Sequence, residues 1–456
     1  MDTHGRTERA ERARGIVETL TDRGVAAVAL TFVDNAGISR VKTVPVSHLP
    51  EAASWGVGMS PVFDFFLVDD SIAPEGSPVG DLRLLPDLDR LTALAAQPGW
   101  AWSPVDRHSQ AGEPHPGCQR HFARRMAETS REQGLEAQMG FEIEWIVGSE
   151  DAEGNFAPAC HGPAYGMGRL VELASYVAQL HRSLAEEGVR VLQIHPEYAA
   201  GQFEVSVAPS DPVAAADTAV LVRETIRALT YAQGMRPSFA PVVTAGGVGN
   251  GGHVHVSVWR EGRNQLSSGN GRHGLSGEGE GFLAGVLAEL PALAAIGAPS
   301  PASYIRLVPS HWAGAYRCWG LENREAALRL ITGSAGEHDR AANAEIKCFD
   351  QAANPYLVVG AVLAAGLAGV KVGGRLPEEV TVDPALLADG ELARRGVERL
   401  PRRLEDALNR LATSEVLAEA MGGPLLDAFL AVRRGELALF AEASDDEVVA
   451  RTRWRY

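Results

Sequence analysis

Cysteine is scarce in this 456-residue sequence, and the few that occur are scattered. No two of them form a C-x-x-C pair, so the sequence favours neither a disulfide framework nor a thiolate zinc site. We expect reduced, mostly buried thiols, as in a cytoplasmic protein. The cysteines are Cys118, Cys160, Cys318 and Cys348.

Basic residues are also few compared with acidic ones. The chain has 42 lysines and arginines against 58 aspartates and glutamates, which gives a net charge of −16. This balance argues against binding of nucleic acid or an acidic membrane as the main function. An acidic surface is compatible with a cationic substrate, and it is equally ordinary for a cytoplasmic enzyme. Residues 1–15 are charged and lack the apolar segment of a secretion signal.

Long hydrophobic runs are nearly absent. The run "YLVVGAVLAAGLAGVKVGG" at 356–374 approaches the length of a membrane span. Because it is rich in alanine and glycine, we predict a buried core helix instead. No internal repeat recurs at a fixed period. The length of the chain predicts two or more domains, or one large domain with a smaller one attached.

A polar stretch rich in proline and glycine at 106–117 is the predicted domain boundary, which gives domains of residues 1–112 and 113–456. In the first domain we predict a helix over 6–23, strands over 26–34 and 39–46, a loop over 55–80 and a short strand within 80–91. In the second domain helices are predicted near 117–133, 168–188, 211–233, 279–297, 356–372, 400–411 and 413–434. Strands are predicted near 136–148, 201–208, 251–259, 324–331 and 344–350.

Several predicted strands carry acidic or imidazole side chains on one face. Residues two apart in a strand share a face, which places Glu142 with Glu144, Gln202 with Glu204, His253 with His255, and Glu345 with Lys347. A half-solvated sheet would explain each strand alone. Together with Glu197, however, five carboxylates and a histidine would repel one another unless cations lay between them. Oxygen ligands with one imidazole favour Mg²⁺ or Mn²⁺.

Four arginines fall between the histidine strand and the last of these glutamates: Arg306, Arg324, Arg329 and Arg340. Arg306 is predicted in a short strand-like run that precedes a turn. A single arginine is usually a surface ion pair. Metal ions together with several arginines are what phosphoryl transfer requires, because both neutralise phosphate oxygens.

These segments resemble the glutamine synthetase family over nearly the whole chain. The matching motifs are "GFEIEW", "EYAAGQFE", "GNGGHVHVSVW", "SYIRLVP", "ENREAALRL" and "AEIKCFDQAANPYL", and "GDLRLLPD" resembles the end of the family's N-terminal domain. The resemblance implies an α+β fold, with a β-grasp-like domain before a large catalytic domain that contains a curved antiparallel sheet. It also implies self-association into stacked rings, usually a dodecamer, with the site between neighbouring subunits.

The resemblance further implies that ATP activates glutamate to γ-glutamyl phosphate, which an amine nitrogen then attacks, with two or three Mg²⁺ or Mn²⁺ ions per site. It assigns one ion to Glu144, Glu197 and Glu204, and the ion on the ATP phosphates to Glu142, His253 and Glu345. Arg306 and the backbone near Gly249 would hold glutamate, and Arg324 would stabilise the transferred phosphoryl group. The implied nucleotide contacts are Ser257, Arg329 and Arg340.

The chain departs from the family at the ammonium site. In true glutamine synthetases a glutamate that helps to bind and deprotonate ammonium stands six residues after the arginine of "RLVP", and here that position is Trp312. Lys347 stands where the family usually has a second arginine near the substrate. Asn343 stands where the family has an arginine on the phosphate side. Trp312 offers a π-face to an alkylammonium or a wall beside a short carbon chain. The pattern resembles family members that join glutamate to organic amines.

An ethanolamine-like small monoamine is the first choice of amine, because Trp312 stands at the amine position, whereas a long polyamine would favour acidic residues along its channel. A γ-glutamylpolyamine synthetase, an ordinary glutamine synthetase that uses ammonium, and a non-catalytic family member are the alternatives. An alkylammonium has a pKa of about 10 and must lose a proton before attack. Asp64 in "PVFDFF" stands about where the family's other ammonium-side aspartate falls, and it is the candidate base.

Overall fold

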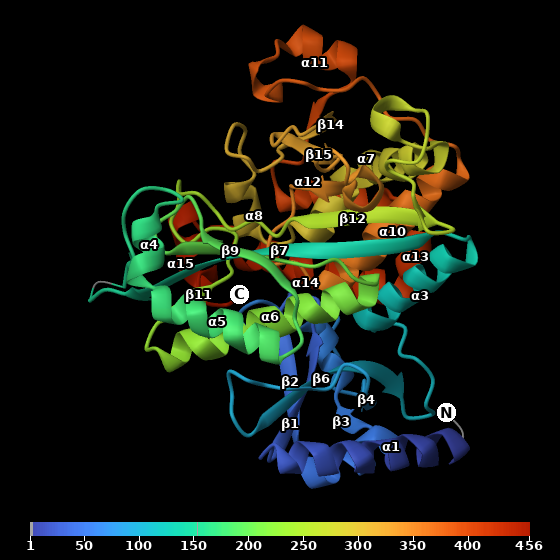
Figure 1. Ribbon diagram of the computed structural model, residues 1–456, viewed down its shortest axis with the longest axis vertical. Coiled ribbons are helices and arrows are strands. Elements are labelled where there is room, and N and C mark those ends of the chain that lie inside the picture. The colour runs from blue at the N-terminus through green and yellow to red at the C-terminus, as the bar shows by residue number, and fades with distance from the viewer. Residues whose placement is uncertain (1–2, 153) are drawn as a thin grey trace.

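The computed structural model describes residues 3–152 and 154–456, and its N-terminal part is a small mixed sheet packed against two helices (Figure 1). The strand order is β2-β1-β6-β4-β3, with β5 paired to β6, and only the β1–β6 pair among them is parallel. The elements are α1 (Thr3–Asp22), β1 (Ala27–Val33), β2 (Ser39–Pro45), α2 (Leu49–Trp55), β3 (Val57–Met59), the 3-10 turn η2 (Pro61–Phe65), β4 (Leu82–Pro86), β5 (Thr92–Ala93) and β6 (Trp100–Ser109).

The larger part of the chain is built on a curled sheet whose strand order is β17-β14-β15-β16-β12-β7-β10-β9. Neighbouring strands are antiparallel, as predicted, except for β14 and β15, which are parallel. The strands are β7 (Glu136–Glu150), β8 (Phe156–Pro158), β9 (Val191–Pro196), β10 (Gln202–Val207), β11 (Arg236–Ser238), β12 (Val254–Arg260), β13 (Arg263–Asn264), β14 (Tyr316–Leu321), β15 (Ala326–Ile331), β16 (Asn343–Ile346) and β17 (Glu398–Arg399).

Helices cover the apolar face of this sheet and supply most of the core. They are α3 (Gln119–Glu132), α4 (Met167–Glu172), α5 (Ala174–Glu186), α6 (Pro212–Ala232), α7 (Gly277–Gly297), α8 (Pro301–Arg306), α9 (His338–Ala341), α10 (Pro355–Lys371), α11 (Asp389–Arg395), α12 (Leu404–Thr413), α13 (Glu415–Met421), α14 (Gly423–Leu439) and α15 (Asp445–Thr452). The predicted buried helix at 356–374 is confirmed as α10, nearly all of whose residues are buried.

Helices α7 and α10 pack closely because small residues meet between them. A Cβ on Gly285 would lie 2.2 Å from the carbonyl oxygen of Ala365, so no larger residue fits there. Within the described residues, α7 is the one helix whose length and apolar composition would let it cross a membrane, but 67% of that segment is buried inside the protein. Its place is therefore that of a core helix.

Several expectations about elements are wrong. The helix predicted over 168–188 is two helices, α4 and α5, and strand β3 lies in the stretch predicted as a loop over 55–80. Arg306 ends helix α8 and does not lie in a strand, because Ser300 caps that helix and Pro301 occupies its first position. The predicted helix 413–434 is divided into α13 and α14 at Gly422, whose φ of 77° is left-handed. Strand β6 extends through Ser109 into the stretch predicted as a break, and it pairs with β1 and β4.

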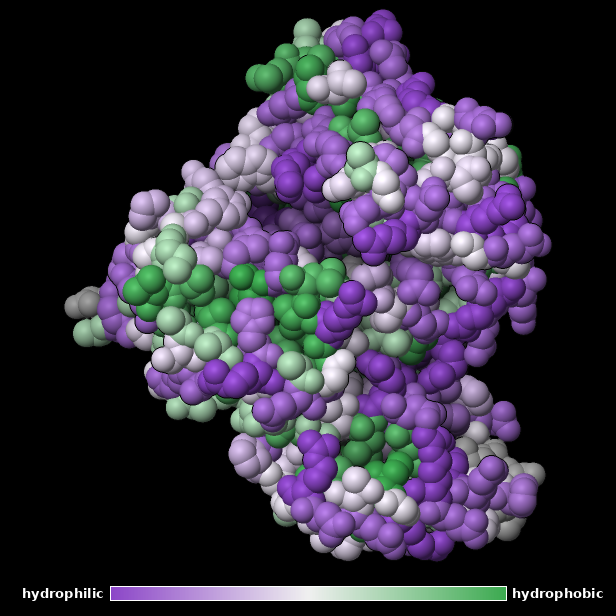
Figure 2. All heavy atoms as spheres, in the orientation of Figure 1, coloured by the Kyte–Doolittle hydropathy of each residue, from purple (hydrophilic) through white to green (hydrophobic). Residues whose placement is uncertain are grey.

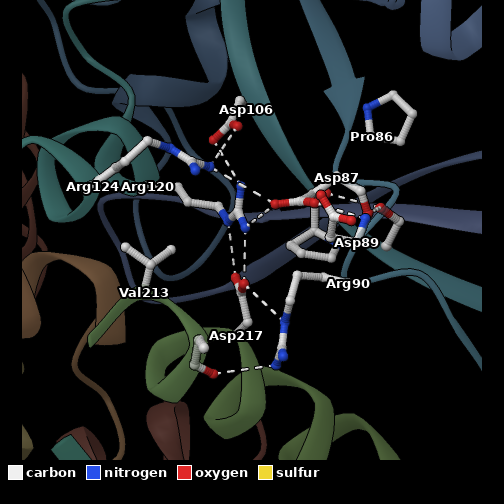
Figure 3. Close-up of polar contacts among 12 residues, drawn as sticks. Pro86, Asp87, Asp89, Arg90, Asp106, Arg120, Arg124, Val213 and Asp217 are labelled. Atoms are coloured by element: carbon white, nitrogen blue, oxygen red, sulfur yellow. Dashed lines mark hydrogen bonds and ion pairs between the residues drawn. The ribbon is translucent and has the colours of Figure 1, made fainter. Parts of the chain in front are cut away.

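A buried arginine joins the small sheet to the helices of the larger part (Figure 3). Arg120, on α3, bonds to Asp106 on β6 at 2.9 Å, to Asp87 after β4 at 2.6 Å, and to Asp217 on α6 at 2.9 Å. Burial opposes its charge, but Asp217 and the other carboxylates raise the pKa of Arg120 well above its ordinary value. The contact fixes the start of α3, which leads into β7 and the site described next.

Candidate active site

The polar face of the large sheet opens into a cavity of about 590 Å³. Figure 2 shows a hydrophilic hollow on this face, near α8 and β9. Residues predicted for the site that line it are Glu142, Glu144, Glu197, Glu204, Gly249, His253, Arg306, Trp312, Arg324, Arg329, Glu345 and Lys347. The structure therefore brings these twelve sequence-predicted residues to one place.

Strand register explains why the acidic side chains meet. Glu144 on β7 lies directly opposite Glu204 on β10, and His255 on β12 lies opposite Glu345 on β16. Alternate residues of β7, such as Ile143 and Trp145, point into the core instead. The alternation of apolar and acidic positions along each strand thus produces one buried apolar face and one carboxylate-bearing face.

Glu142, His253 and Glu345 form the first group of possible metal ligands. The His253 Nδ1 atom lies 2.9 Å from Glu142 and 3.3 Å from Glu345. Burial alone would raise the pKa of Glu142, but hydrogen bonds from His253 and His255 hold it well below its usual range. Burial would likewise raise the pKa of Glu345, but Lys347 and the two histidines lower it to about 2.

The remaining carboxylates gather in two overlapping groups, one of Glu144, Glu204 and His253 and the other of His195, Glu197 and Glu204. This partition differs from the predicted set of Glu144, Glu197 and Glu204, because His195 on β9 reaches Glu204 at 3.4 Å. A hydrogen bond to Glu204 raises the pKa of His195 to about 9. Burial and the nearby Glu204 and Glu197 raise the pKa of Glu144 to about 7, although His253 opposes this.

The donor set fits hard divalent cations. Carboxylate oxygens dominate it, with an imidazole in each group, and within each group the ligand atoms lie within 4.8 Å of one another. Such a set suits Mg²⁺ or Mn²⁺ better than a thiolate-preferring metal. Gly251 leaves the space open, because a Cβ there would lie 2.5 Å from His253 and 2.7 Å from Glu144. The raised pKa of Glu144 is the expected mark of like charges crowded together in a buried place.

Cationic side chains also line the cavity. Arg306 is buried, and its Nη1 atom has no hydrogen-bond partner within the described part of the chain. A buried guanidinium nitrogen without a partner is suited to an anionic ligand. Arg324 is exposed at the rim, in the turn before β15. Arg329 and Lys347 pair with Glu345 at 2.9 Å and 3.0 Å, so they are first of all its counter-ions.

Comparison with known proteins identifies the family. The family described as glutamine synthetase, catalytic domain, matches residues 116–451. The chain belongs to the glutamine synthetase family. The predicted family, fold class and enzyme class, an ATP-dependent ligase of the glutamine synthetase type, are therefore confirmed.

Individual members of the glutamine synthetase family align over nearly their full length. A protein of Streptomyces coelicolor named gamma-glutamylpolyamine synthetase is 56% identical, over 99% of this chain and 98% of that one. A glutamate–methylamine ligase of Methyloversatilis universalis is 29% identical, over 94% and 96%. A crystal structure described as a novel glutamine synthase homolog has a TM-score of 0.84 and 36% identity, covering 95% of this chain and 99% of that one.

Three residues that the glutamine synthetase resemblance assigned to the site do not line the cavity. Asp64 lies in η2 of the small sheet, where its carboxylate pairs with the fully buried Arg107 and, at 2.9 Å, with His115. Ser257 lies farther along β12 and accepts a hydrogen bond from Trp259. The side chain of Arg340 is 77% exposed and pairs with Glu337. Within one chain these side chains make other contacts, and the roles assigned to them stay predictions.

Two tyrosines at the rim were missed. Tyr198, just after β9, packs its ring against that of Trp312, with the ring centroids 5.3 Å apart, and Tyr165 lines the same side of the cavity. His195 was missed as well, although it stands two residues before Glu197 and the spacing rule for strands could have found it. Tyr198 carries no such signal, because it stands in a turn whose path depends on the rest of the fold.

Proposed function

We propose that this protein joins the γ-carboxylate of glutamate to a polyamine, with ATP as the source of activation. The observation that carries this proposal is that a cavity with all the expected carboxylates, His253 and Arg306 has Trp312 at the position of the family's ammonium-site glutamate. The ligand set supports the common chemistry of glutamate activation. The aromatic replacement supports an organic amine over ammonium.

The choice of amine follows the relatives and the lining of the cavity. An ethanolamine-like monoamine was the first expectation, but the relative that is 56% identical is named a gamma-glutamylpolyamine synthetase. The rim of the cavity also carries two aromatic side chains, Tyr198 and Trp312, whose rings contact each other. Aromatic faces attract alkylammonium groups and pack against methylene chains, which supports an organic amine with an extended carbon chain.

In the proposed reaction, Arg306 and the backbone at Gly249 hold glutamate. Arg324 faces the phosphoryl group that moves from ATP to the γ-carboxylate, and Arg329 contacts the nucleotide. Glu142, His253 and Glu345 would hold a divalent ion that neutralises the phosphate oxygens, and the remaining carboxylates would hold a second ion. The amine nitrogen then attacks the acyl phosphate and phosphate leaves. Guanidinium groups stabilise the charge that develops on the phosphoryl oxygens.

We extend the proposal to assembly, because the amine must lose a proton and Asp64 does not reach the cavity of its own chain. In the ring that the family resemblance implies, a neighbouring copy would bring its Asp64 region to the site. Size-exclusion chromatography with light scattering should then show a ring-sized oligomer. A stable monomer that retains full activity would contradict this part.

The function is tested by phosphate release from ATP with Mg²⁺, glutamate and one amine at a time. The panel contains spermidine, 1,4-diaminobutane, ethanolamine, methylamine and ammonium. We expect the highest kcat/KM with a polyamine and the lowest with ammonium, with the γ-glutamylamine identified by mass spectrometry. Activity with ammonium alone would support an ordinary glutamine synthetase, and absence of activity with every amine would support a non-catalytic role.

A further inference from the structure

The loop between α8 and β14 is held in a strained shape. Ser310 and Trp312 both have left-handed backbone, with φ of 58° and 55°. Non-glycine residues seldom adopt this region, because their Cβ atom lies too close to the following carbonyl oxygen. Two such residues within three positions persist only where surrounding contacts hold them.

Two carboxylates supply those contacts from outside the cavity. The backbone N–H of Trp312 donates to Glu325 Oε1 at 2.7 Å, and the hydroxyl of Ser310 donates to Asp383 Oδ2 at 2.7 Å. Neither Glu325 nor Asp383 is among the described residues that line the cavity. Glu325 is half-buried, and burial raises its pKa, although the N–H of Trp312 opposes this. Glu325 therefore fixes the loop backbone at Trp312, whose aromatic ring lines the cavity.

The rings of Trp312 and Tyr198 together form an aromatic wall. Trp312 and Tyr198 are tilted by 53°, and each remains nearly half exposed to solvent, at 47% and 43%. Both line the cavity. Tyr198 is fixed from its own side, because its N–H donates to Glu197 Oε2 at 3.0 Å. The wall therefore joins two segments far apart in the sequence and stands directly beside a carboxylate of the cavity.

We propose that Tyr198 and Trp312 form the subsite for the carbon chain of the amine, and that Glu325 is the positioning residue that holds Trp312 in it. The inference rests on the proposed function and adds the residues that select the amine. Methylene groups pack against aromatic faces, and an ammonium group is attracted to them.

The test is the chain-length profile of a diamine series, measured as kcat and KM for amine, glutamate and ATP. Tyr198→Ala should raise KM for the longer diamines by about threefold to tenfold, the equivalent of an aromatic contact, and should flatten the preference for chain length. KM for glutamate and ATP should stay unchanged. Tyr198→Phe should keep the profile. Tyr231→Ala removes another exposed tyrosine, which lies on α6 and does not line the cavity, and it should change nothing.

Glu325 is tested as a pair of variants. Glu325→Ala removes the acceptor for the Trp312 N–H and should reproduce the flattened profile of Tyr198→Ala. Glu325→Gln keeps an oxygen acceptor at the same place and should restore the wild-type profile, which a role that depends on the negative charge would not predict.

The possible failures are distinguishable. If the wild type uses organic amines but Tyr198→Ala and Glu325→Ala leave the chain-length profile unchanged, the subsite is wrong while the proposed function stands. Equal increases in KM for all three substrates would also overturn the subsite, because they would show general damage to the cavity. If the wild type uses no organic amine, the proposed function fails and the subsite falls with it.

Discussion

The acidic side chains of the cavity floor project from paired strands, whereas the aromatic side chains of its rim stand in turns. The floor consists of Glu142, Glu144, Glu204, His253 and Glu345, and the rim of Tyr198, His311, Trp312 and Arg324. Floor positions are fixed by sheet register, which the whole core supports. Rim positions depend on single turns, in which residues such as Ser310 and Trp312 have left-handed backbone. The floor therefore suits chemistry shared across a family, and the rim suits the choice of substrate.

The floor and the rim of the cavity also differ in charge. Floor carboxylates are buried beside one another, which raises the pKa of Glu144 to about 7. At the rim, Trp312 and Tyr198 are uncharged side chains in contact with solvent. Substitution at the floor should therefore act on catalysis and on metal-dependent stability, whereas substitution at the rim should act on which amine is used.

The largest expected effect is at the floor, with Glu144→Gln. Glutamine keeps the shape and an acceptor for the N–H of Gly251, which donates to Glu144 at 2.7 Å, but it removes one anionic ligand. We expect activity to fall by about 10²–10³-fold. The midpoint of thermal unfolding without divalent ions should not fall, because a buried like charge has been removed.

Phosphate release and thermal unfolding with and without Mg²⁺ measure both effects. Glu398→Gln, which alters an exposed glutamate on β17, is the matched control and should leave both unchanged. Activity of Glu144→Gln within tenfold of the wild type would show that this floor position is not a metal ligand.

At the rim, Trp312→Glu should exchange one substrate for another. A carboxylate there restores the negative charge that the family uses for ammonium and removes the aromatic face offered to an alkyl chain. We expect the ratio of kcat/KM for polyamine to that for ammonium to fall by about 10–100-fold. KM for ATP should be unchanged, and Trp312→Phe should keep the preference for organic amines. An unaltered ratio in Trp312→Glu would break the division between a catalytic floor and a selective rim.

A smaller effect is expected beneath the floor, at Asp350. This aspartate is fully buried, and burial raises its pKa to about 6, although Arg306 lowers it. Because the folded-state pKa lies above the unfolded value of 3.8, the charged form destabilises the protein above about pH 6, and this cost disappears as the pH falls toward 4. Asp350→Asn should raise the free energy of unfolding by about 1–3 kcal/mol at pH 8 and by less at pH 5.

Urea unfolding of Asp350→Asn and the wild type at the two pH values measures this difference. The asparagine keeps an oxygen for the N–H of Ala352, which donates to Asp350 at 3.0 Å. An equal change in stability at both pH values would show that burial does not shift the titration of Asp350.

The sequence-based predictions also succeeded to different degrees at the floor and at the rim. The floor was predictable, because spacing by two along a strand places Glu142 with Glu144 on one face whatever the exact register. The partition of its ligands was not, since His195 meets Glu204 only through the pairing of β9 with β10. At the rim, Trp312 was found by its spacing from Arg306. Its partners Tyr198 and Glu325 come from other turns, and nothing local brings those turns together.

The fold shows a similar limit. Long periodic segments such as α6 and β7 were predicted, because their patterns extend over many residues. The short helix α8 was mistaken for a strand, although Ser300 and Pro301 carried the signals of a helix start. Strand β6 was hidden, since its polar end at 106–109 resembles a loop until its pairing with β4 is known.

The smallest expected effect is at Arg340, which does not line the cavity. The family resemblance assigned it to the nucleotide, but its side chain points to solvent and pairs with Glu337 on the same short segment. An exposed ion pair of this kind contributes little, so Arg340→Ala should leave kcat and KM for ATP within about twofold of the wild type. Arg329→Ala is the contrasting variant, because Arg329 lines the cavity and holds Glu345. A tenfold increase in KM for ATP with Arg340→Ala would show that the segment around α9 closes over the nucleotide, and the rim would then have to include it.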